Sequence, residues 1–143
     1  MSIFKNDILK IIRPLKRSVF NIYDPIGVKR LFKLRVGLSP LRYHKKRYNF
    51  RDTPNDLCQC QVSAETTEHF LLHCDIFEMV RNSMFVVINP ILEFNGLRFL
   101  EHNRFVKFLL YGHETLRADE NKVVLSATLK FIHESNRFEL ANE

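Results

Sequence analysis

All three cysteines of this 143-residue chain lie within residues 58–74, in the sequence CQCQVSAETTEHFLLHC. The same window holds two histidines, His69 and His73. A chain that uses cysteine so rarely, and places every copy in one short window, needs a physical reason for the clustering. The cysteines could be small buried hydrophobic residues, since free cysteine is often buried, or they could be ligands of one site.

The rest of the chain indicates a reducing environment. The N-terminal sequence MSIFKNDILKIIRPLKRSVF carries charges throughout, so it lacks the apolar segment of a secretory signal. No stretch approaches the roughly 18 consecutive apolar residues of a membrane span. We therefore expect an intracellular protein, cytoplasmic or nuclear or both, with no membrane partner. In that setting, an odd number of clustered cysteines favours a metal over a disulfide.

The spacing in this window is typical of a zinc site. Zinc in structural sites is bound by four Cys and His side chains arranged as a tetrahedron. Cys58 and Cys60 form a first pair, and His69 forms a second pair with either His73 or Cys74. We expect one structural Zn²⁺, because four protein ligands leave no position open for a water nucleophile.

The choice of the fourth ligand depends on the helix that carries it. On a continuous helix, residues four apart share a face, which favours His69 with His73. Residues five apart point about 140° away from each other, so His69 with Cys74 requires a break in the helix. We favour Cys74, because Asp75 can cap a new helix from Ile76 onward. The other choice would also leave a third cysteine unused beside the metal.

Glycine and proline are rare, at four and five residues, and the apolar spacing predicts a small, mainly α domain organised around the metal. Helices are expected over residues 2–12, 15–22, 25–36, 41–50, 75–85, 98–111 and 119–138, with a loop over 52–57. The run FVVINP at 85–90 is ambiguous between a helix end and a strand. One domain is expected, made of a basic helical segment (1–51), the metal-binding region with its following helix (52–83) and a C-terminal helical segment (84–143).

Several residues mark the ends and faces of these helices. Asp24 and Pro25 are start signals, Gly37 is a stop, and Asp119 is a candidate cap for the last helix. The residues assigned to apolar faces are Val28, Leu31 and Leu34; Ile76, Met79, Val80 and Ser83 or Met84; and Val124, Leu125, Thr128, Leu129, Phe131 and Ile132. Lys29, Arg30 and Lys33 fall on another face of the helix that carries Val28, Leu31 and Leu34.

Positive charge is concentrated in the first third of the chain. Residues 1–51 contain 14 Lys and Arg against two Asp, whereas residues 52–143 contain 8 against 14 Asp and Glu. The segment RYHKKRYNFR at 42–51 interleaves cations, which neutralise phosphates, with aromatic rings, which stack on unpaired bases. The candidate nucleic-acid-binding residues are Lys29, Arg30, Lys33, Arg42, Tyr43, Lys45, Lys46, Arg47, Tyr48, Phe50 and Arg51. The alternatives are a solvated basic helix whose aromatic residues pack inward and, less favoured, a helix over 26–36 lying on an anionic membrane.

The segments GVKRLFKLRVGLSPLRYHKKRYNFRDTPNDLCQC and ETTEHFLLHCDIF together resemble the C-terminal end of LINE-type (non-LTR) retrotransposon reverse transcriptases. That family places a C-x-C…H-x4-C zinc knuckle after its polymerase domain. The resemblance implies Cys58, Cys60, His69 and Cys74 as zinc ligands. It also implies RNA or DNA as a non-specifically bound partner, and a polymerase domain as a further one. The family often has glycine after the second cysteine, where this chain has Gln61; glycine would ease a turn with positive φ.

No catalytic constellation is visible in the sequence. Reverse transcriptases hold two magnesium ions with paired aspartates, and this chain has no Asp-Asp pair. Glu120-Asn121-Lys122 matches the end of a nuclease motif but lacks a preceding Pro-Asp, so we interpret it as the solvated first turn of the last helix. We expect a non-catalytic nucleic-acid-binding tail organised by zinc. The alternative is a structural or protein-interaction module, or a non-functional relic of a decayed retroelement.

Overall fold

The computed structural model describes residues 24–98 and 100–138. The elements in chain order are α2 (Pro25–Val36), α3 (Arg42–Arg47), a π-helical turn (His69–His73), a 3₁₀ turn (Asp75–Phe77), α4 (Glu78–Phe94), α5 (His102–Tyr111) and α6 (Ala118–Glu134). The β structure of the described ranges is one isolated bridge between Leu57 and Ala64. The prediction of a mainly α fold is therefore confirmed. The helices expected at 2–12 and 15–22 lie outside the described residues.

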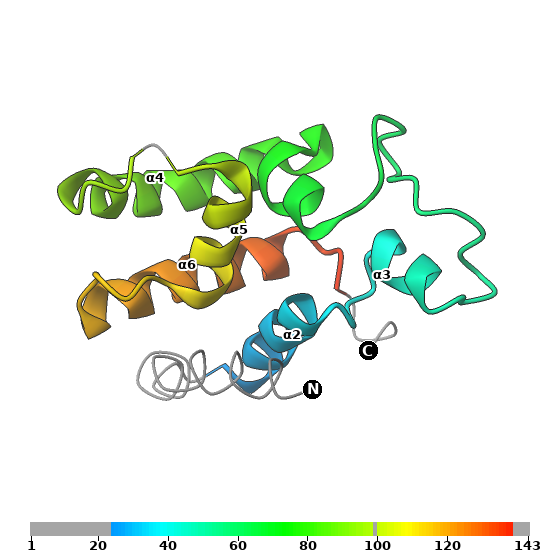
Figure 1. Cartoon of the computed structure of the whole chain (residues 1–143), viewed down its shortest axis with the longest axis horizontal. Helices are drawn as coiled ribbons and strands as arrows, with labels where there is room; N and C mark the ends of the chain where they lie inside the picture. The colour runs from blue at the N-terminus through cyan, green and yellow to red at the C-terminus, as the bar shows by residue number, and fades with distance from the viewer. Residues whose placement is uncertain (1–23, 99, 139–143) are drawn as a thin grey trace.

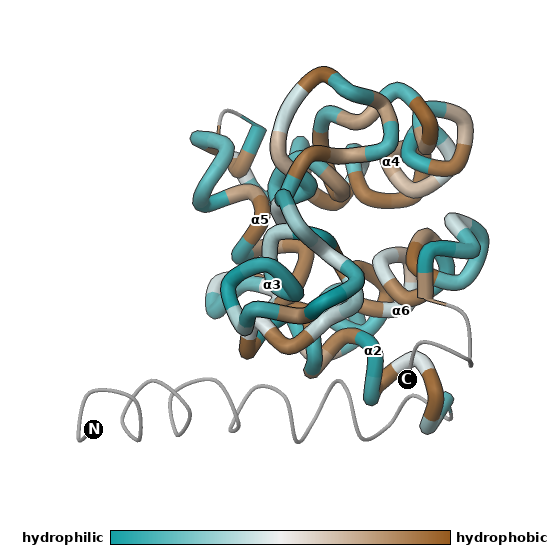
Figure 2. Tube along the Cα trace, turned by 90° about the vertical axis from the view of Figure 1, so that its right-hand side faces the viewer, coloured by the Kyte–Doolittle hydropathy of each residue, from teal (hydrophilic) through white to brown (hydrophobic). Residues whose placement is uncertain are grey.

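Helix α6 is the centre of the fold, packed against α4, α2 and α5 (Figure 1). The two predicted apolar stripes of α6 are confirmed, because all six of their residues are buried. Hydrophobic and hydrophilic residues alternate along the helices, whereas α3 and the chain around it are mostly hydrophilic (Figure 2). Thr128 ties two elements together by donating its hydroxyl hydrogen to the Leu109 carbonyl oxygen at 2.8 Å. α3 and the loop that follows it extend from one end of this helical body (Figure 1).

The predicted ends of α2 are confirmed, but its charged face is not as expected. Asp24 Oδ1 accepts the Gly27 N–H at 2.9 Å, and Gly37 closes the helix with a left-handed φ of 74°. Arg30 was expected to contact nucleic acid together with Lys29 and Lys33, but it is buried. Its side chain is buried against α6, where its Nη1 lies 2.7 Å from His133 Nδ1. Polar partners on α6 allow this cation to sit on the core side of α2.

Helix α4 is longer than expected and turned about its axis. The ambiguous run at 85–90 is helical, and α4 continues through Pro90 to Phe94. The predicted apolar face is wrong in part, because Ile76 and Met79 are exposed, Met79 by 84%. The buried face is formed instead by Arg81, Met84, Ile88 and Leu92. Phe77 of the 3₁₀ turn continues this buried face at helical spacing, and the sequence pattern missed the face because it includes the cation Arg81.

The other helix boundaries shift by a few residues. α3 ends at Arg47 rather than at residue 50, and α5 begins at His102 rather than at 98. α6 runs from Ala118 to Glu134, and Glu120 Oε1 accepts the N–H of Arg117, which takes the capping position expected for Asp119.

The interpretation of residues 120–122 as a solvated turn is wrong for Asn121. The Asn121 side chain is buried, where its Oδ1 accepts the His113 N–H at 2.9 Å and its Nδ2 donates to the His113 carbonyl at 3.1 Å. These two bonds fasten the chain between α5 and α6 onto the first turn of α6. The role they indicate is structural.

Candidate metal centre

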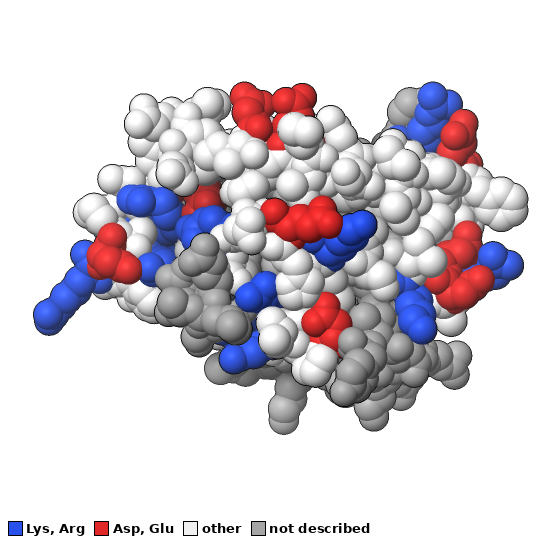
Figure 3. Space-filling model, turned by 180° about the vertical axis from the view of Figure 1, so that it is seen from behind, with Lys and Arg blue, Asp and Glu red and all other residues white. Residues whose placement is uncertain are grey.

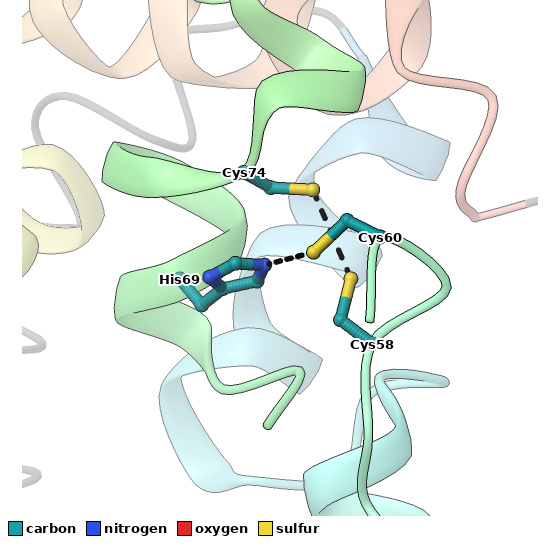
Figure 4. Close-up of side chains that lie close together, drawn as sticks. All are labelled: Cys58, Cys60, His69 and Cys74. Carbon is teal, nitrogen blue, oxygen red and sulfur yellow. Dashed lines mark hydrogen bonds between the residues drawn. The ribbon is translucent and has the colours of Figure 1, made fainter. Parts of the chain in front are cut away.

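Cys58 and Cys60 lie on a tight loop closed by backbone hydrogen bonds. The Cys58 N–H donates to the Ser63 carbonyl and the Gln61 N–H donates to the Cys58 carbonyl, each at 2.9 Å. Gln61 has a φ of 64°, a left-handed conformation that glycine adopts more easily. The turn folds the loop back, so the sulfur atoms of Cys58 and Cys60 both face the following helical turn (Figure 4).

His69 and Cys74 come from the two ends of the π-helical turn. The Cys74 N–H donates to the His69 carbonyl at 2.8 Å, a bond between residues five apart. This wider turn brings residues i and i+5 close together, which an α-helix does not do. The backbone then becomes extended at Cys74, with φ −65° and ψ 123°. The expected helix break is confirmed, but Asp75 begins the 3₁₀ turn and makes no side-chain capping bond.

These elements bring the four predicted ligand side chains together (Figure 4). One ligand atom from each of Cys58, Cys60, His69 and Cys74 lies within 4.8 Å of all the others. The Sγ atoms of Cys58 and Cys74 are 3.8 Å apart, and Cys60 Sγ is 3.2 Å from His69 Nε2. Tetrahedral metal–sulfur bonds of about 2.3 Å require a sulfur–sulfur separation of about 3.8 Å. The group could therefore hold a metal ion with little rearrangement.

Burial and hydrogen bonding shift the pKa values of the four ligand side chains in different directions. Burial raises the pKa of the Cys58 thiol to about 12, and burial likewise raises the pKa of Cys74. The pKa of Cys60 is lowered, chiefly by the backbone N–H of Val62. Burial lowers the pKa of His69, which keeps its imidazole neutral and able to donate a lone pair. A bound cation would supply the charge that turns the two buried thiols into thiolates, with release of protons.

The second ring nitrogen of His69 also has a partner. Its Nδ1 lies 2.9 Å from Ser63 Oγ, so the hydroxyl orients the ring and leaves Nε2 directed at the three sulfur atoms. Histidines that bind metals usually have such an outer hydrogen bond. Sequence reasoning missed Ser63, because a serine between two ligand pairs has no distinguishing spacing.

His73 lies outside this group. Its exposed ring turns toward Glu68, with 3.2 Å between Nε2 and Oε2, and stacks edge-on against His102 with ring centroids 4.8 Å apart. The preference for Cys74 over His73 therefore agrees with the geometry.

Glu65 connects the metal loop to α3 and to the end of the described chain. Its buried carboxylate accepts the Arg42 N–H at 2.7 Å and two guanidinium hydrogen bonds from Arg137, at 2.6 and 2.8 Å. Arg137 also donates to the Pro40 carbonyl at 2.8 Å. No local pattern could have revealed this pair, because its members are 72 positions apart.

The predicted nucleic-acid-binding residues fall into two groups. The exposed ones are Lys29, Tyr43, Lys46, Arg47, Tyr48, Phe50 and Arg51, whereas Lys33, Arg42 and Lys45 are half-buried and Arg30 is buried. Lys45 forms an ion pair with Asp52, with 2.6 Å between Nζ and Oδ2. From behind, Lys and Arg side chains project at the end of the molecule that carries α3 (Figure 3).

A hollow of about 610 Å³ lies between α3 and the metal loop. It is lined by the cations Arg42, Lys45 and Arg137, by the carboxylates of Asp52 and Glu65, which pair with Lys45 and Arg137, and by Asn55, Gln59, Gln61 and Cys58. The hollow therefore places hydrogen-bonding groups and paired charges directly beside the candidate metal centre.

Compared with protein-family models, curated proteins and solved structures, the chain matches none of them. Within the described ranges, no helix combines the length and apolar character needed to cross a lipid bilayer.

Proposed function

We propose that this chain is a non-catalytic module that binds one structural Zn²⁺ and, through the adjacent basic surface, single-stranded RNA or DNA without sequence preference. The donor set supports zinc, since three thiolates and one imidazole form a common structural zinc site. The resemblance to the C-terminal tail of LINE-type reverse transcriptases supports the same partner, with a polymerase domain as a further partner.

The observation that carries this proposal is the direct attachment of the basic helix to the metal loop. Glu65, four residues before His69, accepts the backbone N–H of Arg42 with its side chain and that of Tyr43 with its carbonyl oxygen. Folding of the metal loop therefore positions the start of α3. Metal binding and presentation of the basic surface become one event.

The exposed side chains of this surface have complementary chemistry. Lys46, Arg47 and Arg51 form no ion pair with any described residue, so their charges are available to phosphates. Tyr48 and Phe50 are 51% and 52% exposed, so their rings can stack on unpaired bases. Arg30 is left out of the surface, because its guanidinium is buried.

The test is the salt dependence of binding to fluorescent single-stranded RNA and DNA. In the triple variant K46Q/R47Q/R51Q, affinity should fall and the slope of log affinity against log salt should decrease by about 2, because three phosphate contacts are lost. The control, R104Q/K107Q/K122Q, removes the same charge from exposed positions on α5 and α6 and should leave the slope near that of the wild type. If both triple variants lost affinity and salt dependence equally, or if binding of the wild type were insensitive to salt, the proposed surface would be refuted.

A protein-interaction role is the second candidate, and the outer face of α4 favours it. Met79, Val86 and Phe94 are 84%, 75% and 83% exposed along one side of this helix. Self-association of the purified chain, together with absent RNA binding, would favour this candidate over the first.

A further inference from the structure

A second group of metal-ligand side chains lies beside the first one. Glu68, His73 and His102 each place one ligand atom within 4.8 Å of the other two. Glu68 directly precedes the π-helical turn, His73 is the last residue of that turn, and His102 is the first residue of α5. None of the three belongs to the Cys₃His group.

The π-helical turn explains why two groups occur side by side. His69 and Cys74 are five residues apart and meet at the first group, and Glu68 and His73 are also five apart and meet one position earlier. A regular α-helix would separate both pairs by about 140°. One wide turn thus aligns two ligand pairs on neighbouring faces of the same segment.

The distances fit a single ion. His73 Nε2 and Glu68 Oε2 are 3.2 Å apart, and two tetrahedral ligands with bonds of about 2.0 Å lie about 3.3 Å apart. The rings of His73 and His102 meet edge-on, and one ring nitrogen of each lies within 4.8 Å of the other and of the Glu68 carboxylate. A Glu–His hydrogen bond alone would account for the first contact, but not for the second imidazole from a different helix.

The group is accessible to an ion from solvent. His73 and His102 are exposed, and Glu68 and His73 line a hollow of about 370 Å³ that also reaches Cys60 and His69. A carboxylate and two imidazoles suit a borderline transition-metal cation such as Zn²⁺, Ni²⁺ or Cu²⁺.

We propose that Glu68, His73 and His102 form a second, weaker binding site for a divalent transition-metal ion. The three protein ligands leave a coordination position open to solvent. An ion there links the π-helical turn to the start of α5, and so braces the segment that carries two ligands of the first site. This second site is independent of the proposed nucleic-acid binding.

The experiment is calorimetric titration of Zn²⁺ into the full chain, purified by gel filtration so that only tightly held metal remains. The wild type should show saturable binding of an additional equivalent of Zn²⁺. His102→Ala should weaken it by more than about tenfold, since even outer partners of metal ligands contribute that much. His113→Ala, which removes a histidine outside both groups, is the matched control and should leave the affinity unchanged.

His102 is the decisive position, because its helix carries no ligand of the Cys₃His group. Glu68→Gln and His73→Ala should weaken the binding of the additional Zn²⁺ by the same factor. The tightly held metal should be retained in all variants. Copper added to the wild type should also show nitrogen hyperfine splitting in its paramagnetic resonance spectrum, reduced in His102→Ala. Equal affinity in His102→Ala and His113→Ala, or absence of a saturable additional equivalent in the wild type, would overturn the second site.

Discussion

Gln61 adopts a conformation that favours glycine, directly beside a predicted metal ligand. Its φ of 64° lies in the left-handed region, which costs a side-chain-bearing residue about 1–2 kcal/mol. The turn is nevertheless required, because it brings Cys58 and Cys60 to face the same group. The strain is local to the loop and can be relieved by one substitution.

Gln61→Gly should therefore stabilise the protein by roughly 0.5–1 kcal/mol, once the greater flexibility of glycine in the unfolded chain is subtracted. Chemical denaturation of the metal-loaded protein measures the change. Gln59→Gly is the matched control, because Gln59 is an exposed residue of the same loop without positive φ, and it should be destabilising. A loss of stability in Gln61→Gly as large as that in Gln59→Gly would contradict the strain argument.

His44 makes stability depend on pH. Burial lowers the pKa of His44, and nearby Arg47 lowers it further, whereas Glu65 raises it. The folded state therefore keeps the ring neutral between Ser39 and Thr67 at pH values where the unfolded chain, with a pKa of about 6.5, binds a proton. The contribution of His44 is fully present above pH 6.5 and is lost as pH falls toward its folded pKa.

We expect the free energy of unfolding to decrease between pH 7.5 and 5.5, and to decrease less in His44→Gln. Glutamine can still contact both hydroxyl groups but does not titrate, and the variant shares every other titrating group, including the metal ligands. Denaturation curves at matched pH values measure the difference. Identical pH dependence in the two proteins would show that His44 does not titrate as described.

At the scale of elements, the π-helical turn is the feature on which the site depends. Spacing in the sequence identified the four clustered side chains, because Cys and His pairs joined by a loop form a local pattern. The pattern also required a helix break between His69 and Cys74. It could not specify a π turn, which depends on tertiary contacts. Arg81 supplies one of these: its buried guanidinium donates to the Leu71 and Phe70 carbonyl oxygens at 2.8 and 3.0 Å.

Arg81→Met should destabilise the protein by about 2–4 kcal/mol, because two buried carbonyl groups of the π turn lose a charged donor. Metal affinity should fall as well, since the same turn positions His69 and Cys74. Arg104→Met, at an exposed position on α5, is the control and should change stability by less than about 0.5 kcal/mol. Denaturation with and without chelator measures both effects. If Arg81→Met left stability and metal affinity unchanged, the π-helical turn would not be what positions the metal ligands.

At the scale of the whole molecule, helix content and the buried stripes of α6 follow from periodicity, whereas the long-range polar contacts do not. Arg30 reaches His133 because α6 packs against α2, and Glu65 reaches Arg137 because the chain just after α6 returns to the metal loop. Single-sequence patterns treat such residues as surface charges. The Glu65–Arg137 pair joins the metal loop to the helical body, so loss of metal should affect the whole fold.

Zinc content and folding, measured on one purified sample before and after chelation, test the central claim most directly. We expect one tightly held zinc per chain, retained in His73→Ala and lost in Cys74→Ser. Chelation should abolish cooperative thermal unfolding, because structural zinc contributes about 10–16 kcal/mol in zinc-finger peptides, comparable with the total stability of a small domain. A chain without zinc, or one that unfolds identically after chelation, would contradict a metal-organised fold.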